Sequence, residues 1–142
     1  MNTLNILLVE DNEGDILLTT ETLNEDADIG RLDVVRDGKA AIEYLENLDG
    51  NKGGVDLVLL DLNLPKLNGL EVLKFIKKNK KYNRLPVIIL TTSSSQSDIL
   101  LCYQNYANCY LIKPYDANDF AEVLTRLKYL WSQVVALPDK HP

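Results

Sequence analysis

The segment Asp56-Leu-Val-Leu-Leu-Asp61 decides the fold, because it is a short apolar run that ends in a carboxylate. A continuous apolar run without polar alternation is typical of a strand buried on both faces of a parallel sheet. Similar runs occupy residues 5–9, 86–90 and 110–112, and they are followed by Glu10, Thr91 and Lys113. Open α/β sheets place their sites at the carboxyl ends of the strands. We therefore expect these polar side chains to converge at one edge of a sheet.

Short apolar runs alternate with longer segments of helical period along the whole chain. Strands are expected near residues 5–10, 32–36, 56–61, 86–91 and 109–112. Helices are expected near residues 13–25, 38–48, 68–80, 97–106 and 117–136. Five βα units in series predict a doubly wound α/β fold, in which a five-stranded parallel sheet is joined by right-handed crossovers.

Turn residues support this division of the chain. Asp37-Gly38 and Asn68-Gly69 are expected to open the second and third helices. The segment 47–54 is rich in glycine and polar residues, and it predicts an exposed loop.

The bulk composition excludes several functional classes. A chain of 142 residues has the length of one domain, and its net charge of −6 argues against a nucleic-acid-binding module. The sequence shows neither a signal peptide nor an apolar stretch long enough for a membrane span, so we expect a cytoplasmic protein. Cys102 and Cys109 lack metal-site spacing and are expected to be buried thiols.

Two features of the predicted surface have more than one interpretation. A basic cluster near the end of the third helix consists of Lys74, Lys77, Lys78, Lys80, Lys81 and Arg84. We favour a solvated helix end over a partner-docking patch. The last helix carries the apolar stripe Phe120, Val123, Leu124, Leu127, Trp131 and Val134, extended by Tyr129, Leu130, Val135 and Leu137. This pattern fits either a wide core face or a second apolar surface that packs on another chain.

The residues at the strand ends suit phosphoryl chemistry. The carboxylate of Asp61 can attack a phosphorus atom and form an acyl phosphate. Glu10 and Asp11 offer hard oxygen ligands for Mg²⁺, whose charge offsets the repulsion between carboxylate and phosphoryl oxygens. The ammonium of Lys113 can pair with phosphoryl oxygens or hold Asp61 in place, and Thr91 adds a hydroxyl donor. Each residue alone could be a helix cap or a surface residue, but their convergence favours a site.

The bond between Lys113 and Pro114 closes a tight turn at the end of the fifth strand. An X-Pro bond in such a turn is a candidate for cis geometry, which would aim the lysine inward.

Five segments together resemble the receiver domain of two-component response regulators. They are LLVEDN at 7–12, VRDGKAAIEYL at 35–45, LVLLDLNLPKLNG at 57–69, PVIILTTS at 86–93 and CYLIKPYD at 109–116. The resemblance implies a flavodoxin-like sheet in the order 2-1-3-4-5 with five helices. It further implies a receiver domain at residues 1–137, a tail at 138–142 and no output domain.

The resemblance also implies the roles of the site residues. Asp61 would be the phosphoacceptor and Lys113 the partner of the phosphoryl group. Asp11 would bind Mg²⁺ directly, Glu10 would bind it through water, and Asn63 would offer its backbone carbonyl.

The remaining residues that the resemblance marks are switch residues. Thr91 would move to bond a phosphoryl oxygen, and Tyr110 would turn inward as it moves. The alternative for Tyr110 is an amphipathic strand residue whose hydroxyl faces water. Ser93, like Asn63, flanks the site and is expected to tune hydrolysis of the acyl phosphate.

Within this family, several short segments of the chain resemble single-domain regulators of the cyanobacterial-phytochrome type. The segments EDNEGD, DLNLPKLNG, LTTSSS and NCYLIKP carry this similarity. It implies a homodimer through the face of the fourth helix, fifth strand and fifth helix, and a sensor histidine kinase of phytochrome type as one candidate partner.

The predicted function is that of a stand-alone response regulator. A histidine kinase would donate a phosphoryl group to Asp61, and the signal would pass to a downstream protein target or a phosphotransfer protein. The only histidine, His141, lies in the predicted tail, so the donor must be another molecule. The protein would catalyse only its own phosphorylation and dephosphorylation.

Three rival functions fit parts of the same pattern. An aspartyl phosphatase usually needs a general acid two residues after the nucleophile, where this chain has Asn63. A flavin-binding protein is disfavoured because Glu10 and Asp11 would repel the flavin phosphate. An interaction module that has lost phosphorylation stays open as an alternative.

Overall fold

The computed structural model describes residues 3–25, 27–48 and 54–138. These residues form a five-stranded parallel sheet in the order β2-β1-β3-β4-β5. The strands are β1 (Leu4–Val9), β2 (Ile29–Val35), β3 (Leu57–Leu60), β4 (Val87–Thr91) and β5 (Cys109–Ile112). The predicted α/β class and the strand order 2-1-3-4-5 are therefore confirmed.

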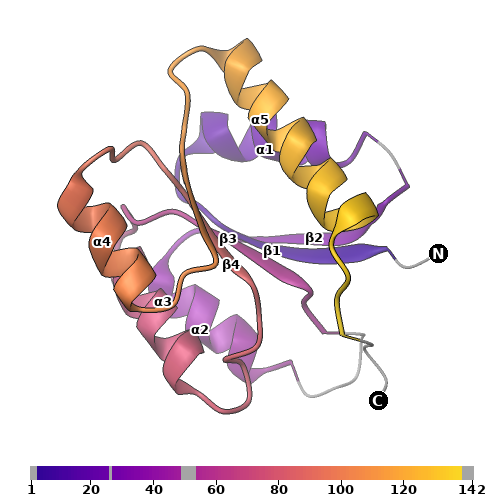
Figure 1. The fold of residues 1–142 in the computed structure, drawn as a ribbon. Helices are drawn as coiled ribbons and strands as arrows, with labels where there is room; N and C mark the ends of the chain where they lie inside the picture. Colours follow the sequence, from indigo (N-terminus) through magenta and orange to yellow (C-terminus); the bar gives the residue numbers. More distant parts are fainter. Residues whose placement is uncertain (1–2, 26, 49–53, 139–142) are drawn as a thin grey trace.

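Helices cover both faces of the sheet (Figure 1). The helices are α1 (Glu13–Leu23), α2 (Gly38–Glu46), α3 (Gly69–Lys78), α4 (Gln96–Gln104) and α5 (Ala117–Tyr129). Helices α1 and α5 lie together on one face, whereas α2, α3 and α4 lie on the other. Helix α5 continues into a π-helical turn at Leu130–Val134.

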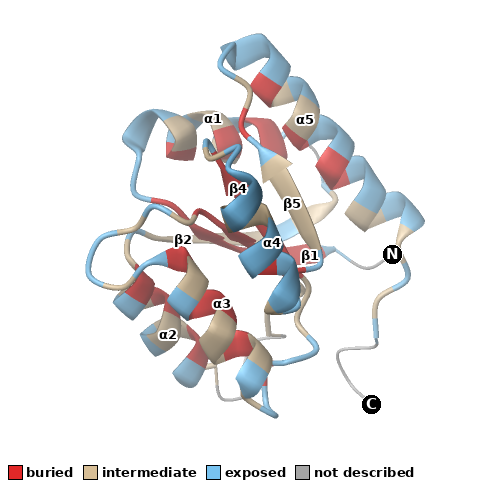
Figure 2. Cartoon of the chain, turned by 60° about the vertical axis from the view of Figure 1, so that its left-hand side comes forward, coloured by how far each residue is buried: buried red, intermediate tan, exposed pale blue. Residues whose placement is uncertain are grey.

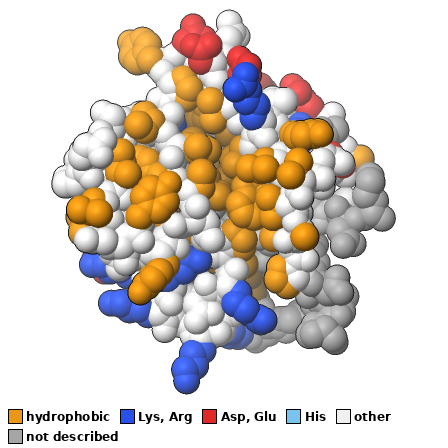
Figure 3. Space-filling model, viewed as in Figure 1, with side chains coloured by type: hydrophobic (Ala, Val, Ile, Leu, Met, Phe, Trp, Pro, Cys, Tyr) orange, Lys and Arg blue, Asp and Glu red, His pale blue; other side chains and the backbone are white. Residues whose placement is uncertain are grey.

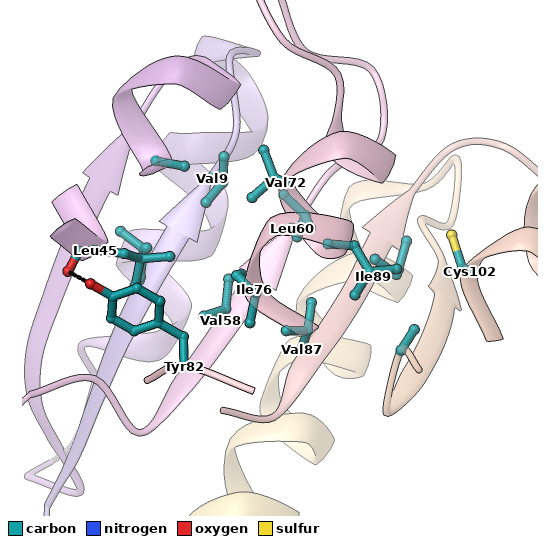
Figure 4. Close-up of a cluster of buried hydrophobic side chains, with 14 residues drawn as sticks. Val9, Leu45, Val58, Leu60, Val72, Ile76, Tyr82, Val87, Ile89 and Cys102 are labelled. Carbon is teal, nitrogen blue, oxygen red and sulfur yellow. Dashed lines mark hydrogen bonds between the residues drawn. The ribbon is translucent and has the colours of Figure 1, made fainter. Parts of the chain in front are cut away.

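The three central strands, β1, β3 and β4, are buried along their whole length (Figure 2), and apart from Asn5 and Thr91 they are apolar. Alternate side chains of one strand enter two separate cores, since successive strand residues point to opposite faces. Val58 and Leu60 pack with Val72 and Ile76 beneath α3 (Figure 4). Leu57 and Leu59 belong to the second core, under α1 and α5. This double burial explains why the central strands read as unbroken apolar runs.

Each helix begins with a side-chain cap at the carboxyl edge of the sheet. Asn12, Asp37, Asn68, Ser95 and Asp116 each accept a hydrogen bond from a backbone N–H in the first turn. Such caps satisfy donors that have no partner inside the helix. The predicted helix starts at Asp37-Gly38 and Asn68-Gly69 are confirmed.

Two element boundaries differ from the sequence prediction. Strand β2 begins at Ile29 rather than near residue 32, and it is only partly buried along its length. Gly30 and the polar residue Arg31 hid its start, because an edge strand does not need a continuous apolar run. The last regular helix ends at Tyr129 rather than near residue 136, although the π-helical turn extends it.

The stripe on the last helix is divided between a core face and an exposed apolar surface. Phe120, Leu124 and Leu127 are buried in the core beside α1, and Trp131 packs partly against it. Tyr129, Leu130 and Val134 are exposed instead.

The basic cluster is mostly exposed, as expected of a solvated helix end, but Lys77 is partly buried and hydrogen-bonded. Lys77 and Lys78 occupy the last turn of α3. The ammonium of Lys77 donates to the backbone carbonyl of Leu85 at 2.8 Å and to Asn108 Oδ1 at 3.0 Å. Lys77 therefore ties the end of α3 to the loop before β4.

The expectation of two buried thiols is confirmed for one cysteine and not for the other. Cys102 is a buried free thiol, and Cys109 is also free but only partly buried. Among the described residues, no helix has the length and apolar character needed to cross a membrane. Most of the predicted loop at 47–54, and residues 139–142 of the tail, lie outside the described residues.

Candidate functional site

The sheet brings the predicted polar residues together at its carboxyl edge. Glu10 follows β1, Asp61 follows β3, Thr91 ends β4 and Lys113 follows β5. All four are buried, with exposures of 2%, 6%, 0% and 7% respectively. Buried charges need partners, so this cluster must be explained by contacts within it.

Lys113 is the hub of the cluster. Its Nζ lies 2.5 Å from Glu10 Oε1, 2.8 Å from Asp15 Oδ2 and 2.9 Å from Asp61 Oδ2. An ammonium has three N–H donors, so these three carboxylates use its full capacity.

Asp15 was not among the residues that we predicted for the site. It lies in the first turn of α1, four residues after Asp11. Because Asp11 precedes the helix, the spacing of the two residues does not place them on one helix face, and only the contact with Lys113 marks Asp15.

The electrostatics of the cluster separate its two buried carboxylates. Burial raises the pKa of Glu10 to about 7, and the nearby Asp61 charge adds to the increase, despite the hydrogen bond from Lys113. Burial alone would also raise the pKa of Asp61, but the hydrogen bond and charge of Lys113 outweigh it, and the net shift is downward. The three carboxylates raise the pKa of Lys113 although burial opposes this. Asp61 is therefore held ionised beside a fixed ammonium.

Three carboxylates form a cluster that could hold a cation. Single oxygens of Glu10, Asp11 and Asp61 lie within 4.8 Å of one another. Hard divalent cations favour such carboxylate oxygens. The second oxygen of Glu10 accepts hydrogen bonds from the backbone N–H groups of Asp11 and Asn12, at 3.1 and 3.2 Å. These bonds fix the orientation of the carboxylate without using the oxygen nearest Lys113.

Asn63 lies in the loop after β3, next to the predicted acceptor. Its backbone N–H donates to Asp61 Oδ1 at 3.2 Å, which orients that carboxylate. The loop folds back at Gly69, where an added Cβ would lie 2.1 Å from the Asp61 carbonyl oxygen. Only glycine therefore allows α3 to begin this close to the site.

Thr91 is an exception in this well-bonded cluster. Its hydroxyl is fully buried, and it makes no hydrogen bond with any of the described residues. An unsatisfied buried hydroxyl is costly, so it is commonly explained by a ligand or a second conformation. Thr91 still lies near enough to Asp61 to contribute to the lowered pKa of that carboxyl.

Tyr110 contacts the loop between β4 and α4. Its hydroxyl donates to the backbone carbonyl of Ser93 at 2.9 Å, and its ring packs partly against the core under α3. The alternative in which this hydroxyl faces only water is therefore wrong. Ser93 Oγ donates in turn to Asp98 Oδ2 at 2.6 Å, which anchors the start of α4. Tyr110 and Ser93 thus connect β5 to the start of α4, whereas the Thr91 hydroxyl makes no hydrogen bond to either residue.

The expected cis bond before Pro114 is wrong in this structure, because every described peptide bond is trans. The backbone N–H of Lys113 donates to the Thr91 carbonyl at 2.7 Å, which continues the pairing of β5 with β4. This pairing already directs the lysine side chain to Asp61, so no cis turn is needed to aim it.

Sequence comparison decides the family. The response regulator receiver domain family matches residues 6–125. The chain belongs to this family. It is 43% identical over 129 residues to the probable methanogenesis regulatory protein FilR2 of Methanothrix harundinacea, which covers 89% of this chain and 82% of the relative.

Solved receiver structures are also closely similar to this receiver. The phosphorylated cyanobacterial phytochrome response regulator RcpA superposes with a TM-score of 0.91 at 37% identity, covering 96% of this chain and 99% of that one. The Mn²⁺-bound form of Rcp1 gives a TM-score of 0.86 at 38% identity, covering 94% and 97%. Rcp1 of Synechocystis sp. is 39% identical over 135 residues. The chain is therefore a receiver domain of two-component signalling, and its acidic cluster fits the divalent-metal binding of such domains.

Proposed function

We propose that this receiver accepts a phosphoryl group on Asp61 from a phosphohistidine of a sensor histidine kinase, in a Mg²⁺-dependent reaction. The observation that carries the proposal is the 2.9 Å pairing of Asp61 with Lys113 inside a buried carboxylate cluster. The family and the phytochrome-linked relatives support a kinase of phytochrome type as donor. We propose that this phosphoryl transfer takes place in the cytoplasm, where ATP is available to the kinase domain.

The chemistry uses the ionised carboxylate as the nucleophile. One Asp61 oxygen bonds to phosphorus as the bond from phosphorus to the imidazole nitrogen of the donor breaks, and that nitrogen keeps the electron pair. Lys113 would pair with a phosphoryl oxygen after releasing one of its present carboxylate partners. When bound by Asp11, Asp61 and the Asn63 carbonyl, and through water by Glu10, Mg²⁺ would supply the charge that offsets anion repulsion. Reaction is confined to the chain's own aspartate, so the protein acts on no separate substrate.

The signal would leave through Thr91 and Tyr110. The Thr91 hydroxyl has no present partner among the described residues, and a phosphoryl oxygen on Asp61 would give it an acceptor. Movement of Thr91 would alter the space beside Tyr110, which holds the loop before α4 through Ser93. Ser93 and Asn63 border this loop and the acceptor, and we propose that both tune hydrolysis of the acyl phosphate.

The direct test is the intact mass after incubation with acetyl phosphate and Mg²⁺. We expect one phosphoryl adduct on the wild type, none on Asp61→Asn, and loss of the adduct with EDTA. Because Asn keeps the shape of Asp without its charge, this variant separates the acceptor role from folding. A folded wild type without an adduct, and without binding of beryllofluoride, would instead indicate an interaction module that has lost phosphorylation.

The output surface that we propose is the face of α4, β5 and α5. Apolar side chains gather there (Figure 3). The exposed members are Leu100, Leu101, Tyr103, Tyr106, Ile112, Tyr129, Leu130 and Val134. Exposed apolar patches of this kind mark interaction sites. We propose that a second copy of the receiver, formed by residues 1–137, or a downstream protein such as a phosphotransfer partner docks on this face.

The dimer proposal predicts a change in hydrodynamic size. We expect gel filtration to show a dimer with beryllofluoride and Mg²⁺, and Ile112→Asp to abolish it while leaving beryllofluoride binding intact. Leu17→Asp, which changes an exposed apolar residue on α1, is the matched control. A monomer in every state would leave a different downstream protein as the partner of this face.

A further inference from the structure

Lys113 is fully occupied before any phosphoryl group arrives. Its three donors contact Glu10, Asp15 and Asp61 at 2.5, 2.8 and 2.9 Å. An ammonium has no fourth donor, so while Asp61 is still an ionised carboxylate an incoming phosphoryl oxygen can pair with Lys113 only if one carboxylate gives way. The proposed function therefore requires an exchange of partners at this lysine.

The three carboxylates differ in how easily they could be released. The side chains of Glu10 and Asp61 are 3% and 8% exposed, whereas that of Asp15 is 28% exposed. In the metal-free site, Glu10 or ionised Asp61 would stay desolvated and unpaired if it lost the ammonium, which costs several kcal/mol. Asp15 can turn to water instead, where the loss of an ion pair costs little. Water access thus singles out Asp15 as the partner that can leave.

The position of Asp15 also separates it from the acceptor machinery. It belongs to α1, and its backbone N–H is held by the Asn12 cap at 2.9 Å. The cluster of carboxylates that could share a cation contains Glu10, Asp11 and Asp61 but not Asp15. Asp15 therefore acts on the acceptor site only through its ion pair with Lys113.

We propose that Asp15 is an exchangeable partner of Lys113, which holds the lysine in the phosphate-free receiver and is displaced by a phosphoryl oxygen. Asp15 is a positioning residue in this scheme, since it touches neither the acceptor nor the phosphoryl group. Its negative charge competes with the incoming anion for one ammonium. Asp15 thereby lowers the occupancy of the phosphorylated state and favours a bound cation.

This inference rests on the proposed phosphoryl site, and its test uses two ligands with opposite charge. Beryllofluoride is titrated calorimetrically into the full chain at saturating Mg²⁺, and Mg²⁺ is titrated alone in a second series. For Asp15→Asn we expect beryllofluoride to bind roughly twofold to fivefold more tightly, and Mg²⁺ to bind more weakly by a similar factor. Asp15→Ala should show the larger gain, because alanine leaves no acceptor for the lysine.

Glu13→Gln is the matched control, since Glu13 is an exposed carboxylate in the same turn of α1. It should change neither affinity by as much as Asp15→Asn does. Opposite shifts for anion and cation are specific to the charge competition, because a general loosening of the site would weaken both ligands.

Three results would overturn the inference about Asp15. The first is weaker beryllofluoride binding by both Asp15 variants, which would make Asp15 a support that Lys113 needs. The second is an unchanged affinity, and the third is an equal change in Glu13→Gln. A wild type that binds no beryllofluoride would count against the proposed function itself, so the two failures are distinguishable. Thermal unfolding of each variant verifies that it is folded.

Discussion

Lys113 and Thr91 end neighbouring strands of the same sheet, yet their polar groups are in opposite states. All three donors of Lys113 are used by carboxylates, whereas the Thr91 hydroxyl has no partner within the described part of the chain. Both residues are buried. The difference indicates that Lys113 and its carboxylates already stabilise one another in the phosphate-free site. The Thr91 hydroxyl, in contrast, is buried without a hydrogen bond. Changes to the two residues should therefore have opposite effects on stability.

The largest effect is expected from Lys113→Ala. This change leaves Glu10 and Asp61 buried without their ammonium, and breaking such a buried pair costs about 4 kcal/mol. The free energy of unfolding in urea without metal measures the loss. Mg²⁺ should restore more stability to Lys113→Ala than to the wild type, since a cation can replace the missing charge.

Lys78→Ala, at an exposed lysine in the last turn of α3, is the control for loss of a positive charge. If Lys113→Ala unfolds no more easily than Lys78→Ala, the ion-pair hub contributes no net stability, and the contrast with Thr91 disappears.

The second effect is a pH dependence that originates from Glu10. Its pKa is raised from 4.5 to about 7 in the folded protein, so the folded state keeps a proton that the unfolded chain releases. Stability due to this group is present below pH 4.5 and is lost as the pH rises to about 7, by up to about 3 kcal/mol. Asp61 acts in the opposite sense, because its lowered pKa contributes stability that is lost only in stronger acid.

Urea unfolding between pH 4.5 and 7.5 in EDTA would reveal the Glu10 contribution. The slope should flatten in Glu10→Gln, which cannot titrate, and also when Mg²⁺ is added to the wild type. An equally steep slope in Glu10→Gln would assign the titration to another group.

The sequence was sufficient to predict the central part of this molecule. Strands β1, β3 and β4 are buried on both faces, so each had to be a continuous apolar run. The polar residues that follow or end these strands were therefore visible as a group. The edge strand β2 could not be bounded as well, because partial exposure allows polar residues such as Arg31 within it.

The missed part of the site depends on tertiary contacts. Asp15, in the first turn of α1, contacts Lys113, which follows β5 and lies 98 residues later in the sequence. No local pattern specifies that contact. The geometry before Pro114 was likewise decided by the pairing of β5 with β4, which the residue pair itself does not show.

The smallest effect is expected from Thr91→Val, and its sign differs from that of Lys113→Ala. Valine has nearly the shape of threonine but no hydroxyl, so the change removes a buried group that lacks a partner. We expect the phosphate-free protein to become more stable by about 1 kcal/mol. Urea unfolding in EDTA is the measurement, and Thr91→Ser, which keeps the hydroxyl but leaves a small void, should be destabilised instead.

The same pair of variants connects stability to signalling. If the unmet hydrogen bond of Thr91 drives the switch, Thr91→Val should still bind beryllofluoride but should lose the change that it causes at Tyr110, measured by NMR of that ring. Thr91→Ser should keep the change, because its hydroxyl can still reach a phosphoryl oxygen. A Tyr110 response that survives in Thr91→Val would show that the signal reaches the Ser93 loop by another route. The vacant hydrogen bond would then be a cost of the fold rather than the origin of the switch.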